Sequence, residues 1–151
     1  MARLAEGIDV IRLLWQAGEP VDFEGRFFSL RRAVLGLSPF GAGPPVWTAA
    51  HGPRMLELTG RKADGWLPTK MTPGQYQASL KAIEVAAREA GRDPEAITPA
   101  MLGYVLLGPD EALRIVAGIP PAVVRHYAFC GTPEQVAAQV RDTPRPGCGT
   151  W

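Results

Sequence analysis

A histidine, a glycine and an arginine stand where an apolar run gives way to a helical pattern, in the stretch VWTAAHGPRMLEL (residues 46–58). In parallel α/β folds, ligands bind at the carboxyl ends of the strands. Ala50 and Gly52 have little side-chain bulk, so a ligand can approach the backbone closely. The first amides of the following helix have no partners within it and carry a partial positive charge. The stretch therefore predicts a site for a phosphate or a similar anion.

The histidine and the arginine of this stretch each have more than one interpretation. Arg54 lies in the first helical turn, where a cation opposes the helix dipole unless an anion is bound. It is therefore either a ligand of that anion or a solvated surface side chain that costs roughly a few tenths of a kcal/mol. His51 is a base, a contact to the phosphate or a histidine with one structural hydrogen bond.

A second strand end offers two more candidates. Thr69 and Lys70 follow the short apolar stretch ADGWLP (residues 63–68), at a position equivalent to that of His51. They either reach the same anion or form a solvated loop before the next helix.

The sequence assigns no catalytic residue. Glu57, Asp64 and Glu111 form no recognisable acid–base pair, and Asp64 is interpreted as a residue that organises a turn. His126 has no visible partner and is interpreted as structural.

The composition is that of an ordinary globular protein, with 46% hydrophobic and 21% charged residues and a formal net charge of +1 over 151 residues. Binding to nucleic acid or to a membrane surface needs a basic stripe, which the scattered basic residues do not form. Cys130 and Cys148 have neither CxxC nor Cys/His spacing, so no metal or redox site is predicted. The sequence has no bilayer-length apolar run and no signal-peptide pattern, which predicts a reduced, cytoplasmic protein.

The elements that must position these residues follow from periodicity and capping. Helical spacing over residues 4–15 predicts a first helix that ends near Gly18, and VDFEGRFFSL predicts a hairpin with its turn at Glu24–Gly25 and Phe27 on its second arm. Strands are expected at 46–50, 63–69 and 100–108, the last covered on both faces. Helices are expected after each strand, the third from about residue 110, and again at 132–142.

Two of these helices carry the same start signal, a threonine followed by proline and then by glutamine at the third helical position. Thr72 with Gln75, and Thr132 with Gln135, form capping boxes. Alternating strands and helices indicate a parallel sheet, either part of a (β/α) barrel or a small doubly wound sheet. A complete eight-stranded barrel takes about 250 residues, more than this chain has.

Several segments together resemble the luciferase-like monooxygenase family: RLAEGIDVIRLLW, VDFEGRFFSL, PPVWTAAHGPRMLELTGRKADGWLPTK, EAGRDPEAITPA and GTPEQVAAQVRD. Members of this family are flavin- or deazaflavin-dependent oxidoreductases on a TIM-barrel fold. The segment from Thr69 to Ala100 looks most like the branch that uses coenzyme F-420. The resemblance therefore implies coenzyme F-420 as the cofactor, with FMN as the alternative.

The resemblance also implies where the cofactor binds. It assigns the cofactor phosphate to the loop that follows the barrel's fifth strand and to the loop after the sixth. In this sequence those loops correspond to the residues Ala50, His51, Gly52, Arg54, Thr69 and Lys70.

The match covers part of the family's barrel. Residues 1–142 resemble a partial (β/α)8 TIM-barrel domain that lacks the N-terminal strands and the last strand, with a hairpin insertion at about 20–31. The prolines and glycines of TPRPGCGTW exclude a buried strand, so residues 143–151 are interpreted as an irregular, truncated or frame-shifted tail.

Two functions follow from this reading. The first is a fragment of an oxidoreductase that transfers hydride between a deazaflavin, or FMN, and a small organic substrate. The alternative is an inactive half-barrel remnant that binds a phosphate-bearing cofactor weakly at most. Unpaired sheet edges also predict self-association of the chain.

Overall fold

The computed structural model describes residues 1–37, 39–41, 43–69, 71–108 and 121–143. In chain order the elements are α1 (Ala2–Gln16), β1 (Val21–Glu24), β2 (Ser29–Ala33), β3 (Trp47–Thr48), α2 (Pro53–Lys62), β4 (Gly65–Trp66), α3 (Pro73–Glu89), the 3-10 helix η1 (Pro94–Ala96), β5 (Thr98–Pro99), β6 (Tyr104–Leu107), α4 (Pro121–Tyr127), β7 (Ala128–Gly131) and α5 (Pro133–Arg141). Strands and helices alternate from β3 to β5, as the sequence predicts, and β6 then follows β5 without a helix between them.

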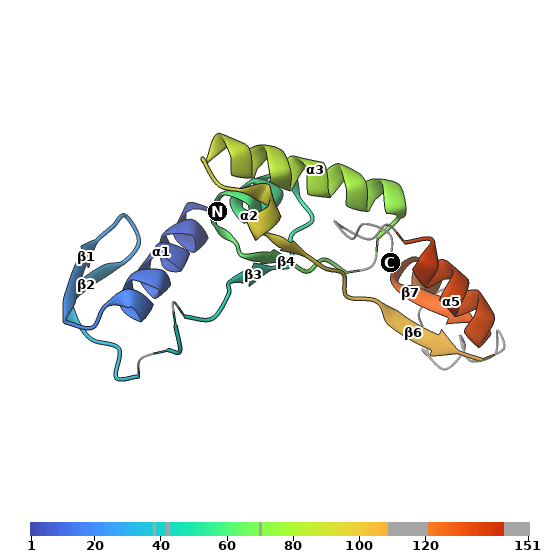
Figure 1. The fold of residues 1–151 in the computed structure, drawn as a ribbon, viewed down its shortest axis with the longest axis horizontal. Coiled ribbons are helices and arrows are strands. Elements are labelled where there is room, and N and C mark those ends of the chain that lie inside the picture. Colours follow the sequence, from blue (N-terminus) through green and yellow to red (C-terminus); the bar gives the residue numbers. More distant parts are fainter. Residues whose placement is uncertain (38, 42, 70, 109–120, 144–151) are drawn as a thin grey trace.

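The strands of the described residues form three sheets. β3, β4 and β5 pair in parallel in this order, β6 and β7 form a second parallel pair, and β1 and β2 form an antiparallel hairpin. Figure 1 shows α2 and α3 together on one side of β3 and β4. Among the described residues no sheet closes on itself. The class is therefore α/β, with an open parallel sheet covered by helices on one face.

The predicted capping boxes begin two of the helices. Thr72 Oγ1 accepts from the Gln75 N–H, and Gln75 Oε1 accepts from the Thr72 N–H. Thr132 and Gln135 make the same pair of bonds at the start of α5. Each box satisfies two backbone donors that the first turn leaves without partners, which fixes where the helix starts.

The main core lies between β3–β5 and the helix pair α2–α3. Its buried residues come from all of these elements and the loops beside them: Ala50, Leu56, Trp66, Tyr76, Ile83, Ala87 and Ile97. Gly60 lets α2 approach α3 closely, because a Cβ there would collide with the Ile83 carbonyl and lie 2.9 Å from the Ala87 nitrogen. This contact holds the two helices against the sheet.

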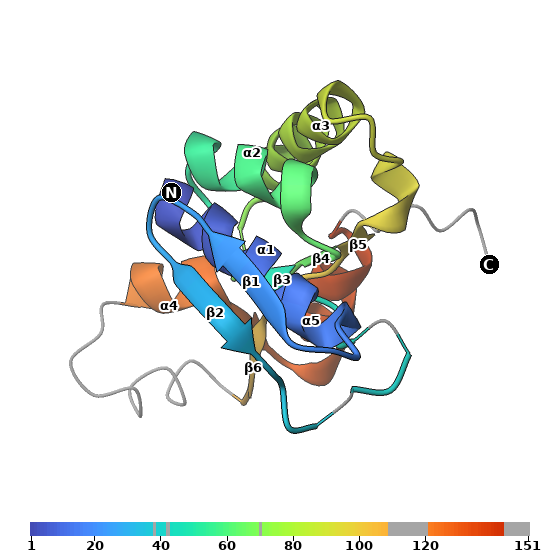
Figure 2. The ribbon, with the colours of Figure 1, turned by 90° about the vertical axis from the view of Figure 1, so that its left-hand side faces the viewer.

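The hairpin lies along α1 (Figure 2) and differs from its prediction in the turn. Phe27 belongs to the turn and not to the second arm, since β2 begins only at Ser29. The cause is Glu6 of α1, whose carboxylate accepts the N–H groups of Arg26, Phe27 and Phe28 at 3.1, 2.7 and 2.7 Å. A side chain distant in sequence therefore sets the length of the turn.

The strand expected at 100–108 is wrong in its extent. Residues 98–107 form β5 and β6, which pair with different neighbours and are separated at residues 100–103. The expected cover on both faces is also wrong, because Val105 and Leu107 of β6 are 53% and 57% exposed. An apolar run predicts a strand well, but it does not show where the pairing changes partner.

β7 was not predicted. Its four residues pair with β6 in register, for example Leu106 with Cys130, and they end at Gly131 in the left-handed region, where φ is 130°. The helix expected from about residue 110 and most of the predicted tail, residues 144–151, lie outside the described residues, as does the His126 side chain.

Candidate functional site

The register of β3, β4 and β5 sorts their side chains onto two faces. Residues on neighbouring parallel strands at the same level share a face, and successive residues along a strand alternate. Thr48 and Trp66 are such neighbours and face the helices. Thr48 Oγ1 lies 2.7 Å from Thr59 Oγ1 of α2, and the Trp66 side chain is fully buried. The helix-facing side is therefore a closed core.

The opposite face, called the open face below, carries Trp47, Leu67 and Leu102. These side chains are 41%, 36% and 46% exposed. By the same alternation His51 and Thr69, which follow β3 and β4, belong to this face. The open face therefore combines an apolar floor with two polar side chains at its carboxyl edge.

The structure brings together two of the predicted site residues from different loops. The Thr69 hydroxyl lies 3.2 Å from His51 Nε2 and forms a hydrogen bond with it. This bond joins the carboxyl end of β3 to that of β4. It also agrees with one of the three interpretations of His51, a ring with a hydrogen-bond partner, and leaves the other ring nitrogen available to a ligand.

The first turn of α2 is open beside this pair. Gly52 is the N-cap residue and no side chain caps the helix there. A Cβ built on Gly52 would meet no atom within 4 Å among the described residues. Met55 and Leu56 donate to the Gly52 carbonyl, Pro53 has no N–H, and within the described part of the chain the Arg54 N–H meets no acceptor. This terminus can therefore offer the Arg54 N–H and the exposed Arg54 side chain to an anion.

Ala50 contributes through its backbone only. Its side chain is 1% exposed and lies in the core, while its carbonyl accepts from Trp66 Nε1 at 2.9 Å. Lys70 lies outside the described residues. Four of the six predicted residues, His51, Gly52, Arg54 and Thr69, are therefore at the exposed edge.

Trp66 and Tyr76 are residues that the sequence reasoning missed at this edge. Their ring centroids lie 4.9 Å apart, and the Tyr76 hydroxyl donates to the Ala100 carbonyl at 3.2 Å. A tyrosine phenol is protonated at neutral pH, and burial raises the pKa of Tyr76 further, so the hydroxyl remains a donor. The available signal was ADGW itself, in which an aromatic residue with an N–H donor stands in a buried strand.

At the amino edge of the same sheet, charged side chains from several elements pair with one another. The Asp64 carboxylate accepts from Arg12 Nη2 of α1 at 2.6 and 2.7 Å and from the Val46 N–H at 2.8 Å. Arg92 Nη2 lies 3.6 Å from Asp64, and Arg92 donates to the carbonyls of Gly60 and Ala63 at the end of α2. The interpretation of Asp64 as a turn residue is therefore too narrow, because its partners come from elements far away in the sequence.

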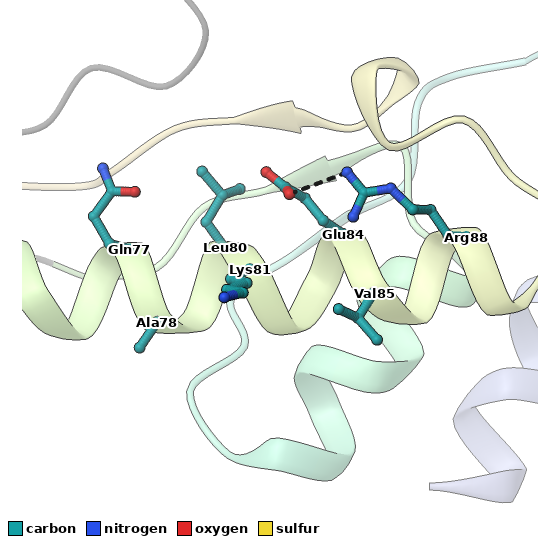
Figure 3. Close-up of a pocket in the computed structure, with 7 residues that line it drawn as sticks. All are labelled: Gln77, Ala78, Leu80, Lys81, Glu84, Val85 and Arg88. Carbon is teal, nitrogen blue, oxygen red and sulfur yellow. Dashed lines mark hydrogen bonds and ion pairs between the residues drawn. The ribbon is translucent and has the colours of Figure 1, made fainter.

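Other candidates do not reach the carboxyl edge. Glu57 pairs with Arg61 on the outside of α2 at 3.0 Å, and Glu111 lies outside the described residues. A hollow of about 410 Å³ runs along the outer face of α3 between Gln77 and Arg88 (Figure 3). The residues that line it all belong to this one helix, so it shares no residue with the strand ends. We take the carboxyl strand ends, and not this hollow, as the candidate site, because polar groups from several elements converge there and none of them is used in an ion pair among the described residues.

The described residues contain no group of three or more His, Cys, Asp or Glu side chains that could hold a metal ion. None of their helices combines the length and the hydrophobicity that crossing a membrane requires.

Comparisons with known proteins identify the family and the fold. The family model described as luciferase-like monooxygenase matches residues 1–117. A phthiodiolone/phenolphthiodiolone dimycocerosates ketoreductase of Mycobacterium bovis (strain BCG / Pasteur 1173P2) is 44% identical, over 94% of this chain and 52% of its own length. A 5,10-methylenetetrahydromethanopterin reductase of Archaeoglobus fulgidus is 28% identical, over 94% of this chain and 44% of its own.

A solved structure, an F420-dependent secondary alcohol dehydrogenase in complex with an F420-acetone adduct, superposes with a TM-score of 0.79 at 26% identity, covering 91% of this chain and 50% of the other. The chain spans about half the length of the curated relatives it matches. The fold shared with these barrel enzymes confirms that the open sheet is part of a TIM barrel.

Proposed function

Since the chain belongs to the luciferase-like monooxygenase family, we propose that it is part of an oxidoreductase that binds the phosphate of coenzyme F-420 at the carboxyl ends of β3 and β4. The observation that carries this proposal is the hydrogen bond between His51 and Thr69 beside the uncapped first turn of α2. These groups come from two strand ends and one helix start, where barrel enzymes bind phosphate groups.

The residues present fit such a group. An anion at the first turn of α2 would meet the partial positive charge of the helix and the Arg54 guanidinium. Between residues 44 and 56 Arg54 is the only residue with a formal charge, so no carboxylate of this segment repels a phosphate. The Thr69 hydroxyl and the His51 ring nitrogen that does not bond Thr69 can add hydrogen bonds, and we propose Lys70, the next residue in the sequence, as a second cation. The apolar open face beside them suits a planar ring.

The reaction we propose is hydride transfer between the cofactor and a ketone or a secondary alcohol. The class of substrate is suggested by two relatives, one named a ketoreductase and the other solved with an F420-acetone adduct. The deazaflavin would supply the hydride chemistry. The residues of this chain would bind and orient the cofactor, and we assign none of them a catalytic role.

FMN is the alternative cofactor, and an inactive half-barrel that binds either cofactor weakly is the alternative function. Both share the same phosphate site. The FMN alternative differs from the main proposal in that FMN would bind more tightly than coenzyme F-420. The inactive half-barrel differs in that the spectrum of the bound cofactor would not change when a ketone or a secondary alcohol is added.

The test is a fluorescence titration of the purified chain with coenzyme F-420 and with FMN. We expect saturable binding of F-420, weakened about tenfold or more in Arg54→Ala, because a charged hydrogen bond to phosphate is lost. Arg61→Ala is the matched control. It removes an arginine from the same helix that pairs with Glu57 and Glu89, and it should leave the affinity unchanged. A folded protein that binds neither cofactor would rule the proposal out.

We also propose that the isolated chain self-associates. The exposed apolar side chains of the open face and of β6 have no cover among the described residues, and unpaired strand edges invite pairing with another chain. Light scattering on a concentration series measures this directly. A monomer of constant mass at all concentrations would contradict it.

Three predictions from the sequence remain proposals. They are the domain boundary at about residue 142, the irregular tail from 143 to 151, and the cytoplasmic location. Limited proteolysis followed by mass spectrometry tests the boundary, since cleavage is expected first beyond α5. Fractionation of cells tests the location.

A further inference from the structure

Trp66 lies at the centre of the carboxyl edge, although no part of it reaches the surface. Its side chain is fully buried between the sheet and α3, where it stacks on Tyr76 at an interplanar angle of 32°. Its one polar group, the indole N–H, donates to the Ala50 carbonyl at 2.9 Å. The bond therefore connects a core side chain to the last residue before His51.

This bond replaces a rung of the sheet. The Leu67 N–H donates to the Thr48 carbonyl at 2.9 Å, so the next rung in a parallel ladder would join the Thr69 N–H to the Ala50 carbonyl. The Ala50 carbonyl is bonded to the Trp66 indole instead. Within the described residues the Thr69 N–H meets no acceptor. The pairing of β3 with β4 thus stops at the level of the indole.

On the other side of β4 the pairing continues. The Ala100 N–H donates to the Trp66 carbonyl at 2.8 Å, and the Leu102 N–H donates to the Pro68 carbonyl at 2.8 Å. The early end of pairing is therefore specific to the β3–β4 side, where the indole bond lies. It releases the chain at His51 to turn outward into α2.

We propose that Trp66 is a positioning residue for the cofactor phosphate. By drawing the Ala50 carbonyl toward its indole N–H and away from Thr69, it ends the β3–β4 pairing and keeps the Thr69 N–H free to donate to the phosphate, beside the Thr69 hydroxyl and His51. This inference rests on the proposed function for its ligand. Its structural step, a backbone N–H kept free by a side chain, is independent of that function.

Tyr76 provides the matched control. It belongs to the same aromatic pair and also binds a strand-end carbonyl, but that carbonyl belongs to Ala100 beyond β5. Tyr76→Phe and Trp66→Phe each remove one buried hydrogen bond from the core, so each should lower the thermal midpoint. Only Trp66→Phe releases the Ala50 carbonyl.

The test combines two measurements on the full chain. In the titration with coenzyme F-420, Trp66→Phe should weaken binding by about tenfold, as expected for one hydrogen bond to a charged group, whereas Tyr76→Phe should change it less than twofold. Equal losses in the two variants would overturn the inference and leave the proposed function intact.

The second measurement is amide hydrogen exchange by NMR without any ligand. A variant that merely loosens the core speeds exchange, whereas the inference requires that Trp66→Phe slow the exchange of the Thr69 N–H, because the rung to the Ala50 carbonyl can then form. Unchanged or faster exchange overturns the inference even if no cofactor binds. If Trp66→Phe does not fold, the benzothiophene isostere of tryptophan, which has sulfur in place of the N–H, removes the same bond at nearly constant shape and is judged by the same two results.

Discussion

The two edges of the parallel sheet are built in opposite ways. At the amino edge Asp64 joins α1, β3 and β4 through Arg12 and the Val46 N–H, while Arg92 binds the last carbonyls of α2. At the carboxyl edge Thr69 and His51 share a hydrogen bond, and Trp66 and Tyr76 donate to the carbonyls of Ala50 and Ala100. Charges are thus paired within the chain at the amino edge, whereas the carboxyl edge is held by uncharged groups and leaves the exposed Arg54 side chain available to a ligand. In barrel enzymes the first edge serves stability and the second binds ligands.

The largest loss of stability is expected from Asp64→Ala, which leaves Arg12 and the Val46 N–H without their acceptor. We expect the free energy of unfolding to fall by about 2–3 kcal/mol, below the full value for a buried pair because Asp64 is partly exposed. Urea denaturation measures it. Affinity for coenzyme F-420, measured where the variant is folded, should stay within twofold of the original.

Arg12→Ala and the double variant complete the test of Asp64. If the two residues act as one unit, the double variant should lose much less stability than the sum of the two single losses. Additive losses would mean that the pair does not stabilise the amino edge, and the contrast between the edges would fail there.

The next effect, about 1–2 kcal/mol, is expected from Gly60→Ala. Alanine is the better helix former by about 1 kcal/mol, but its methyl group would enter the backbone of α3 at Ile83 and Ala87, and overpacking costs more than propensity gains. Thermal unfolding measures the loss. Gly74→Ala, at a helical position where a Cβ would meet no described atom within 4 Å, is the control and should be neutral or stabilising. Equal behaviour of the two variants would contradict the close packing of α2 on α3.

The fold and the candidate site could be predicted from the sequence to different extents. Local signals, such as the threonine–proline–glutamine capping boxes and the alternation of apolar runs, predicted most helices and the parallel sheet. The turn around Phe27 and the split of β5 from β6 were missed. Both depend on partners distant in sequence, Glu6 in one case and a change of neighbouring strand in the other.

The candidate site was predictable where it is made of backbone and small residues. The order strand, Ala50, His51, Gly52, helix indicates an open strand end without any knowledge of contacts. The roles of Asp64 and Trp66 were not predictable, because each acts through a partner 52 or 16 residues away. A sequence pattern shows which groups a residue carries, and only the fold shows which groups it meets.

A smaller effect on stability, with the opposite sign, is expected from Arg54→Glu at the carboxyl edge. Exchanging a cation for an anion in the first turn of α2 should stabilise the ligand-free protein by about 0.5 kcal/mol and reduce the affinity for coenzyme F-420 at least tenfold. Calorimetry measures both quantities. Arg88→Glu makes the same charge change in the last turn of α3, where it should destabilise and leave the affinity unchanged. Destabilisation by Arg54→Glu would show that Arg54 has a structural partner.

The smallest effect on stability belongs to Gly52→Ala, the counterpart of Gly60→Ala at the opposite end of α2. The backbone at Gly52, with φ −86° and ψ 154°, suits any residue, and the added methyl group meets no atom within 4 Å among the described residues. Because an N-cap prefers glycine to alanine, we expect the free energy of unfolding to fall slightly, by no more than about 0.5 kcal/mol. The same methyl group would occupy the space in which a phosphate approaches the first turn of α2, so the affinity for coenzyme F-420 should fall about tenfold. Denaturation of this variant measures its stability, and titration measures its affinity for the cofactor; Gly60→Ala does not separate these two quantities. An unchanged affinity would place the phosphate away from the Gly52 backbone.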